Sequence, residues 1–292
     1  RYDFFPSLMR AAAIRQAGLV WASLKNRRHR IGNPLWRMWY RRFFSVFDWI
    51  LPPVPEDAAL FARLHPRVLP PTDLRVGQIL ARLDRGAATL AEKFPLWEAF
   101  HARLEQVARP QRWILGSFWE VDLALFDDPQ VCEQVRSGDL VIIAVPHILG
   151  GAWADLVRAK GVPVHEIRPD LSQLPEGPGV WLVNLTGVLC ELYAHAGRAY
   201  VGGGFGRSIH SVLEPFVAGA QVVVGPRIHR STEYELIRAV EPTAITVCAH
   251  AADLARAMKS SDARALDTRA RWAQNQSSQA LQLLDGVGGE GC

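Results

Sequence analysis

The chain has 292 residues, of which 49% are hydrophobic and 21% charged, and its net charge at pH 7 is +4. This composition is typical of a folded globular protein and excludes an intrinsically disordered one, and the length suffices for more than one core. No apolar run reaches the roughly eighteen residues of a membrane-spanning helix.

The first residue is Arg1 rather than Met, and we expect that an N-terminal segment of the protein precedes it. The four cysteines are far apart and form no CxxC pair, which indicates reduced thiols in a cytosolic protein rather than a zinc site. These cysteines are Cys132, Cys190, Cys248 and Cys292.

Residues 1–50 contain ten Lys and Arg but only Asp3 and Asp48, so this segment carries +8 and the remainder −4. Aromatic residues lie between the basic ones: Trp21, Trp36, Trp39, Phe43, Phe44, Phe47 and Trp49. A basic aromatic segment suits an anionic membrane surface. Nucleic acid would suit the charge as well, but no recognition motif supports it. The alternative is an amphipathic helix with a solvated arginine face.

The first part of the chain predicts mainly helices. Asn33 and Pro34 are favourable at a helix cap and first turn. We expect a helix over 33–46, a short strand at 48–51, a helix over 56–64, an extended segment over 68–74, and a mostly helical segment over 74–107 that bridges two domains. Arg109-Pro110 marks the expected boundary, which gives domains 1–108 and 109–265 followed by a helix and tail over 266–292.

The second part alternates apolar runs with helix-compatible stretches. The runs are 113–115, 140–145, 162–167, 180–183, 199–201, 222–224 and 245–247, and the helical stretches are 129–136, 152–160, 189–196, 211–218 and 233–238. Nearly continuous apolar strands joined by helices predict a parallel sheet covered on both faces, as in a Rossmann-like domain.

The stretch Tyr200–Pro215 predicts a ligand site. A strand leads into Gly202, Gly203, Gly204 and Gly206, and a helix begins near Ser211. Glycines allow close backbone approach, and the free N–H groups of a helix start suit phosphate. Many α/β turns are glycine-rich for packing alone, so the pattern leaves both interpretations open. It matches neither the dinucleotide fingerprint nor the GxxxxGK[ST] loop.

Six motifs, in order along the chain, resemble those of the Kdo (3-deoxy-D-manno-octulosonic acid) transferases. The glycine segment resembles the family pattern of glycines, His, Leu-Glu-Pro and a later Gly-Pro. The matching residues are Gly202–Gly204, His210, Leu213–Pro215 and Gly225-Pro226; the other segments are Asp3–Pro6, Thr72–Arg75, Gly116–Asp122, Pro146-His147, and Asn184–Val188 with Leu192-Tyr193.

The resemblance implies an α/β fold of the glycosyltransferase-B type, with two Rossmann-like domains of which the N-terminal one is truncated here. It implies inverting, metal-independent transfer of Kdo from CMP-Kdo, the substrate, to a lipid A precursor in lipopolysaccharide biosynthesis, with no cofactor. The enzyme would lie at the cytoplasmic face of the bacterial inner membrane, peripherally or through a preceding anchor.

The resemblance also implies the site residues. The CMP contacts would be Pro146, His147, Thr186, Gly187, Val188, Gly203, Gly204, His210, Ser211, Val212, Leu213 and Glu214, with Glu214 on the ribose. Contacts to the sugar or acceptor would come from Asp3, Ser117, Arg207 and Arg227. No metal ligand is expected.

Two positions depart from the family pattern, and one family residue has no counterpart. Val188 stands where the family usually has Glu, and Ser211 where it often has Asn, although Ser caps a helix equally well. The family's general base is a Glu in a Gly-Glu turn, expected upstream of Arg1, so no catalytic residue is assigned in this chain. The alternatives are a related enzyme with another nucleotide sugar, such as a UDP-sugar, and an inactive membrane-surface binding fragment.

Overall fold

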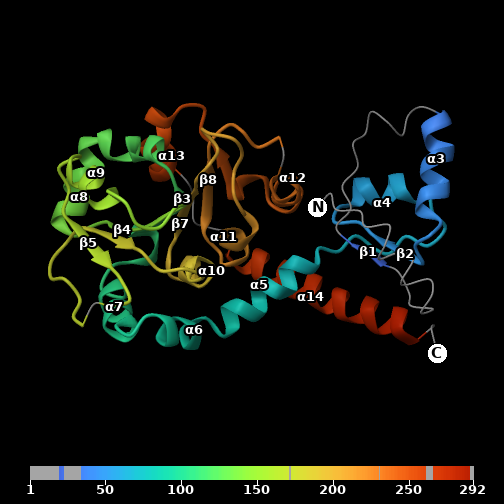
Figure 1. Ribbon diagram of the computed structural model, residues 1–292, viewed down its shortest axis with the longest axis horizontal. Helices are drawn as coiled ribbons and strands as arrows, with labels where there is room; N and C mark the ends of the chain where they lie inside the picture. Colours follow the sequence, from blue (N-terminus) through green and yellow to red (C-terminus); the bar gives the residue numbers. More distant parts are fainter. Residues whose placement is uncertain (1–19, 23–33, 171, 230, 261–265, 290–292) are drawn as a thin grey trace. The chain divides into compact units, whose positions relative to one another are not determined.

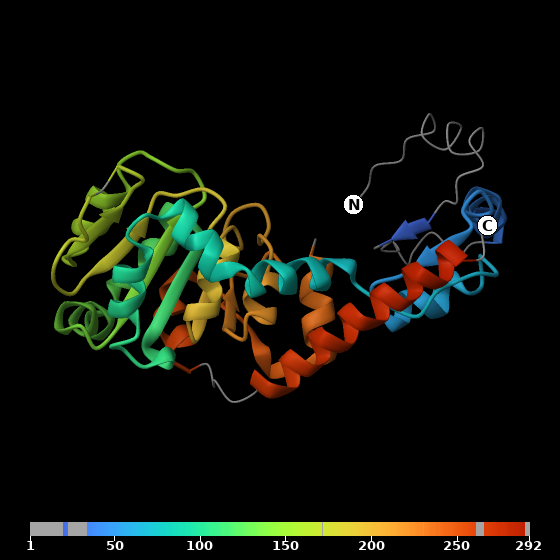
Figure 2. The same ribbon diagram turned by 90° about the horizontal axis from the view of Figure 1, so that it is seen from below.

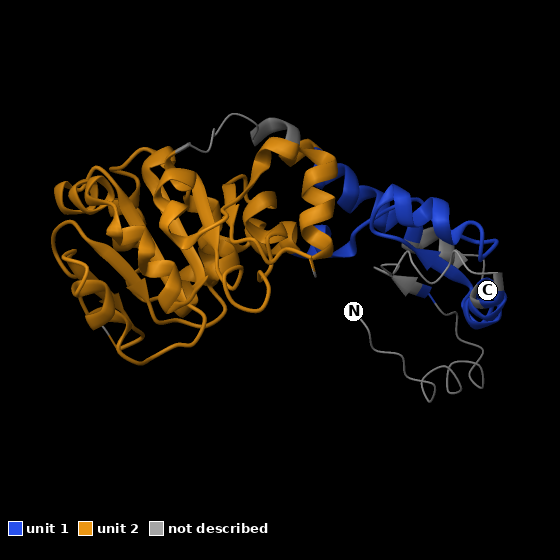
Figure 3. Ribbon diagram, turned by 90° about the horizontal axis from the view of Figure 1, so that it is seen from above, with its two compact units in different colours: residues 1–78, 272–292 blue, residues 79–271 orange. Residues whose placement is uncertain are grey.

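The computed structural model describes residues 20–22, 34–170, 172–229, 231–260 and 266–289. The chain divides into two compact units, coloured separately in Figure 3. Unit 1 consists of residues 1–78 and 272–292, and unit 2 of residues 79–271. None of the described helices combines the length and the apolar character needed to cross a bilayer.

Unit 2 is built on a seven-stranded sheet in which every strand pair is parallel. Its strands are β3 (Arg112–Phe118), β4 (Val141–Pro146), β5 (Val164–Ile167), β6 (Val180–Val183), β7 (Arg198–Val201), β8 (Gln221–Val224) and β9 (Ile245–Val247). The strands coincide with the seven apolar runs, which confirms the predicted α/β fold with a parallel sheet.

The strand order is β5-β6-β4-β3-β7-β8-β9. The first strand of this sheet, β3, therefore lies in its middle. The next three strands, β4 to β6, lie on one side of β3, and β7 to β9 lie on the other. Connections leave β3 and β7 in opposite directions, and ligands of doubly wound sheets bind in the crevice outside the carboxyl ends at such a switch point. A ligand site is therefore expected at the loops after β3 and β7.

Helices cover both faces of this sheet (Figure 1). The face that buries Trp113 and Leu115 packs against the 3-10 helix η2 (Glu120–Asp127), α8 (Pro129–Ser137), α9 (Trp153–Arg158) and α13 (Leu254–Ser260). The face that buries Ile114 packs against α6 (Gly86–Lys93), α7 (Trp97–Leu104), α10 (Leu189–Leu192) and η3 (Tyr193–His195). Successive residues of β3 thus face opposite cores, as the two-residue period of a strand requires. The helices α11 (Leu213–Val217) and α12 (Thr232–Val240) follow β7 and β8.

The division of the chain differs from the boundary expected at residue 109. Residues 79–108 belong to unit 2 because α6 and α7 bury Leu90, Phe94, Trp97, Phe100 and Leu104 in the core of the sheet. Each such side chain contributes about 1.5–3 kcal/mol when it is fully buried. The polar faces of this segment favoured a bridging helix, whereas its apolar face docks on the sheet.

Unit 1 contains a two-stranded parallel sheet of β1 (Val20–Ala22) and β2 (Trp49–Leu51). The helices α3 (Pro34–Phe44) and α4 (Pro55–Phe61) accompany it, and Phe44, Ile50, Phe61 and Leu64 form its core. Strand β1 was not predicted. The segment expected to be extended over 68–74 forms a single bridge, between Val68 and Ile50.

Two helices carry the chain between the units, α5 (Leu74–Asp84) and α14 (Leu266–Gly289), the latter seen as one continuous helix in Figure 2. In α14, the buried Arg269 pairs with Glu241 at 2.7 Å and donates to Ala220 O at 2.7 Å. A buried charge is tolerated only when it is paired and hydrogen-bonded in this way. Arg269 thus fixes the start of α14 to unit 2. Residues 266–292 were expected to form a helix and tail outside that domain.

Candidate functional site

The loop after β3 has an unusual backbone at the switch point. Ser117 has φ 52°, the only positive φ of a non-glycine residue in the described part of the chain, and the pairing register shifts between Gly116 and Phe118. Non-glycine residues in this region carry strain that the surrounding structure must hold, and such residues gather at functional sites. Ser117, an expected substrate contact, therefore lies at the crevice, and the surrounding structure holds its backbone in the strained conformation.

The glycines after β7 allow three backbone segments to approach closely. A Cβ on Gly202 would lie 2.0 Å from the carbonyl oxygen of Ser117, and one on Gly204 would lie 2.6 Å from Cα of Gly225. Gly203 has φ +90°. Packing against the neighbouring loops therefore explains these glycines, which is one of the two interpretations left open, and the packing also determines where the residues after them lie.

Three aromatic rings from three loops stack at this crevice. The His147 ring lies 4.6 Å from that of Trp119 and 4.3 Å from that of His210, with interplanar angles of 30° and 23°. Backbone bonds support the arrangement, since His147 N donates to Phe118 O at 3.1 Å and His210 N donates to Gly202 O at 3.3 Å. We call these three side chains the ring stack. His147 is exposed and His210 half-buried, so the stack presents one face to solvent.

Nε2 of His210 is buried and has no hydrogen-bond partner among the described residues. Burial, and to a smaller extent the neighbouring His147, lower the pKa of His210. A buried polar atom without a partner costs about 1–3 kcal/mol and calls for an explanation. A hydrogen bond to a ligand atom is one explanation, which makes Nε2 of His210 a candidate ligand contact in the crevice.

The start of α11 is occupied by a side chain of the protein itself. Glu233, in the first turn of α12, accepts hydrogen bonds from Ser211 Oγ at 3.0 Å, Val212 N at 2.8 Å and Leu213 N at 3.1 Å. The expectation that this helix start offers free N–H groups to phosphate is therefore wrong for these two amides. The cap of α12 itself is Ser231, whose Oγ accepts a hydrogen bond from Tyr234 N at 3.2 Å. The side chains of Val212 and Leu213 are buried in the core.

Glu214 follows at a half-buried position, with 25% of its side chain exposed. Arg82 forms a two-point pair with Glu191, at 2.9 and 2.8 Å, and approaches Glu214 at 3.7 Å. Burial raises the pKa of Glu214, and Arg82 partly offsets this. Glu214 thus keeps hydrogen-bonding capacity for a ligand, because the guanidinium is committed mainly to Glu191. Neither Arg82 nor Glu191 was identified from the sequence.

Thr186 and Gly187 are exposed in the loop after β6, whereas Val188 is buried. The side chain of Val188 is therefore not available for the expected contact with CMP, which only its backbone could make. The Gly187 carbonyl accepts a hydrogen bond from Lys93 Nζ at 3.2 Å. Gly187 also lines a cavity of about 650 Å³ together with Arg82, Arg85, Ala88, Thr89, Glu92, Lys93 and Glu191. This cavity provides three cationic side chains near the carboxyl edge of the sheet.

The other expected residues lie as follows. Pro146 is buried at the end of β4, while Arg207 and Arg227 are exposed in the loops after β7 and β8. Arg227 N donates to Gly204 O at 3.0 Å, which brings this loop against the glycine loop. Asp3 lies outside the described residues. Asn184, at the end of β6, has a buried Oδ1 without a partner among the described residues, and the sequence indicated it only as part of a motif.

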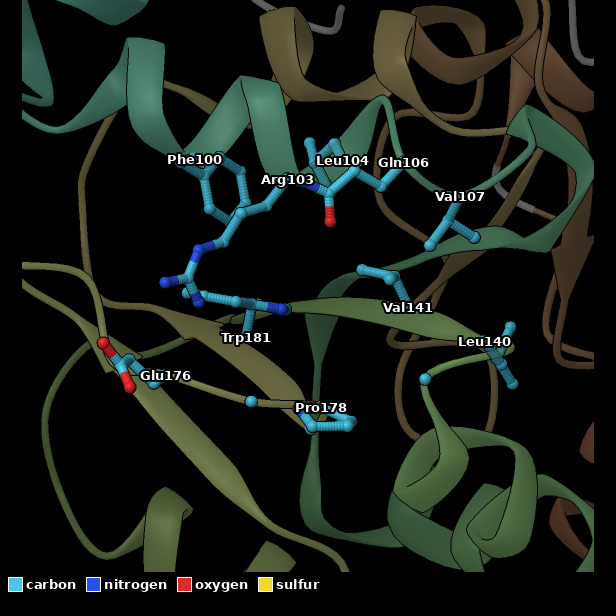
Figure 4. A pocket seen from close by; sticks show the side chains of 13 residues that line it. Phe100, Arg103, Leu104, Gln106, Val107, Leu140, Val141, Glu176, Pro178 and Trp181 are labelled. Carbon is cyan, nitrogen blue, oxygen red and sulfur yellow. The ribbon is translucent and has the colours of Figure 1, made fainter.

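A second cavity, of about 480 Å³, lies at the opposite edge of the sheet (Figure 4). Phe100 and Arg103 of α7 line it together with Trp181 of β6, and Arg103 packs over the Trp181 ring with its guanidinium carbon 5.7 Å from the ring centroid. Arg103 also donates to Pro175 O at 2.6 Å. None of the residues expected from the motifs lines this cavity.

No protein-family model matches this chain, and no curated protein matches it. Among similar solved structures, the C-terminal CMP-Kdo binding domain of WaaA from Acinetobacter baumannii has 21% identity and a TM-score of 0.43, covering 70% of this chain and 98% of that one. The alpha,alpha-trehalose 6-phosphate synthase from Burkholderia multivorans has 12% identity and a TM-score of 0.45, covering 93% of this chain and 65% of that one. WaaG, a glycosyltransferase involved in lipopolysaccharide biosynthesis, has 13% identity and a TM-score of 0.38, covering 94% and 76%. At these values the similarities assign neither a substrate nor an activity to this chain.

Proposed function

We propose that unit 2 binds the nucleotide sugar of a glycosyltransferase at its switch point, with CMP-Kdo as donor and a lipid A precursor as acceptor. The observation that carries the binding proposal is the ring stack with the unpaired Nε2 of His210, at the crevice where doubly wound sheets take their ligands. The identity of the donor rests on the six motifs that resemble Kdo transferases.

For transfer of Kdo, unit 2 needs to bind the donor and to stabilise the departing CMP. The acceptor hydroxyl oxygen bonds to the anomeric carbon of Kdo, the bond from that carbon to the phosphate oxygen breaks, and CMP departs with the electron pair. Groups that donate hydrogen bonds to the departing phosphate, or that neutralise its charge, lower this barrier. Because Glu233 occupies the amides at α11, we assign this role to His210, Arg207 and Arg227, with Glu214 on the ribose. A general base must accept the proton of the acceptor, and we assign it to no residue of this chain.

Nucleotide binding is measured by the thermal shift of the protein with CMP and, separately, with UDP. A ligand at one hundred times its Kd stabilises the folded state by about 2.7 kcal/mol. We expect a shift with CMP that exceeds the shift with UDP, and its loss in His210→Ala but not in Arg103→Ala, a control at the opposite edge. A larger shift with UDP would favour the alternative donor. No shift with either nucleotide would contradict the proposal and favour the fragment without activity.

We further propose that α3 brings the protein to an anionic membrane surface, where the lipid precursor lies. Leu35 and Met38 are 74% and 69% exposed, and Arg41 and Arg42 lie in the last turn. Basic residues near the surface contribute about 1 kcal/mol each to binding of anionic lipid. Arg42→Glu is therefore expected to reduce sedimentation with phosphatidylglycerol vesicles several-fold, whereas Arg136→Glu in unit 2 leaves it unchanged. Equal binding to neutral vesicles would contradict this role of the charge.

A further inference from the structure

Two histidines and a glutamate converge at the amino-terminal edge of the sheet, away from the crevice. His101 lies in the last turn of α7, Glu105 follows it by four residues, and His195 ends η3. One ligand atom from each of the three lies within 4.8 Å of the others, and His101 Nε2 is 3.6 Å from Glu105 Oε1. The spacing of four places His101 and Glu105 on one helix face.

Packing holds both imidazole rings in place. The rings of His101 and His195 are 4.9 Å apart, and each packs against Trp97, at 5.3 and 4.9 Å respectively. Trp97 is itself buried in the core of the sheet. The two rings therefore share a fixed neighbour that limits their orientations, and binding an ion between them requires only small rotations of the side chains.

Arg112, at the start of β3, holds the carboxylate of Glu105 by a hydrogen bond. Its Nη1 donates to Glu105 Oε1 at 2.6 Å, and its Nε donates to Val107 O at 2.6 Å. Carboxylate ligands of metals are commonly oriented by such hydrogen bonds. The charges of Arg112 and nearby Arg109 oppose a cation, so an ion must gain its binding energy from strong bonds to imidazole. Imidazole suits Zn²⁺, Co²⁺ and Ni²⁺, whereas Mg²⁺ and Ca²⁺ prefer oxygen ligands.

We propose that His101, Glu105 and His195 bind a divalent transition metal ion such as Zn²⁺. Two nitrogens and one carboxylate oxygen supply three ligands, and water completes a tetrahedron. Metal–ligand bonds of about 2.0–2.1 Å place tetrahedral ligands about 3.4 Å apart. The His101–Glu105 distance is close to this value, and the remaining separations contract by at most about 1.4 Å, a rotation of side chains at the end of a helix.

The position of this site indicates what the ion does. Glu105 ends the α6–α7 segment, Arg112 begins β3, and His195 precedes β7, so the ion links a surface helix to the two central strands. It binds at the edge opposite to the switch point. The ion therefore stabilises unit 2 without taking part in transfer of the sugar, and the inference is independent of the proposed function.

The test uses the whole chain after removal of metal with a chelator. Titration with Co²⁺ is expected to produce the visible absorption of a tetrahedral complex at one ion per chain, and Zn²⁺ to abolish it by competition. Zn²⁺ is also expected to raise the Tm, because an ion that binds only the folded state stabilises it.

His101→Ala and His195→Ala are each expected to weaken Co²⁺ binding at least tenfold, whereas His250→Ala, an exposed histidine elsewhere in unit 2, retains it. Should His195→Ala fail to fold, His101→Ala decides, because its half-exposed ring lies at the end of α7. Unchanged binding in the His101 and His195 variants, or a Tm that does not respond to Zn²⁺, would overturn the site. The CMP-induced shift is expected to be the same with and without chelator, so that failure of either proposal is recognised separately.

Discussion

Glu233→Ala is expected to lower the free energy of unfolding by about 3–5 kcal/mol, because it leaves two buried amides and a hydroxyl without an acceptor. The Glu233 side chain is 3% exposed and receives the N–H groups of Val212 and Leu213 together with Ser211 Oγ. α11 is only five residues long, so its start depends on this carboxylate. Glu233→Gln keeps an oxygen acceptor, and we expect it to lose less.

Urea unfolding of the three proteins measures these differences. Glu235→Ala, an exposed position in the same helix, serves as the matched control and is expected to change stability by less than about 1 kcal/mol. A loss below 1 kcal/mol in Glu233→Ala would mean that the two amides find another acceptor. If CMP stabilises Glu233→Ala more than the unaltered protein, phosphate binds at the α11 amides after all, as the glycine segment first predicted.

Glu214→Ala is expected to abolish CMP binding, with a loss of affinity of at least about 100-fold, while the fold persists. A carboxylate that accepts hydrogen bonds from two ribose hydroxyls loses charge-assisted bonds of about 1.5–3 kcal/mol each when it is removed. Stability changes little, because Arg82 retains its closer pair with Glu191 when the 3.7 Å contact to Glu214 is lost. Isothermal titration with CMP measures the affinity, and circular dichroism confirms the fold.

The pH dependence of CMP affinity provides a second test of Glu214, because it reports the protonation of its carboxyl. Burial raises the pKa of Glu214 above the usual range of a glutamate, and the ionised form is the better acceptor. CMP affinity is therefore full above this raised pKa and falls as the pH drops through it, at a higher pH than an ordinary glutamate would show. Glu214→Gln, which does not titrate, is expected to lose this step. Unchanged CMP affinity in Glu214→Ala would contradict the assignment of the site.

Local patterns in the sequence were sufficient to locate the seven strands of unit 2, whereas α13 and η2 were not predicted. Every apolar run between residues 113 and 247 proved to overlap a strand, and β4, β6 and β8 are largely apolar because they are buried on both faces of the sheet. The glycines after β7 also predicted a close approach of backbone segments, and in the structure a Cβ at Gly202 or Gly204 has no room. The proposed nucleotide, CMP, rests only on the resemblance of the six motifs.

The tertiary structure alone decided which side chains meet. Glu233 reaches the start of α11 from a helix about twenty residues further on, and Trp119, His147 and His210 stack from loops after three different strands. Likewise, residues 86–104 dock on the sheet although their sequence is consistent with a bridging helix. Propensity and periodicity depend on neighbours within a few residues of one another, whereas these contacts depend on strand order and on burial shared between distant segments. That is why the strands of the sheet in unit 2 were predictable from the sequence, whereas the occupied helix start, the ring stack and the histidine–glutamate cluster were not.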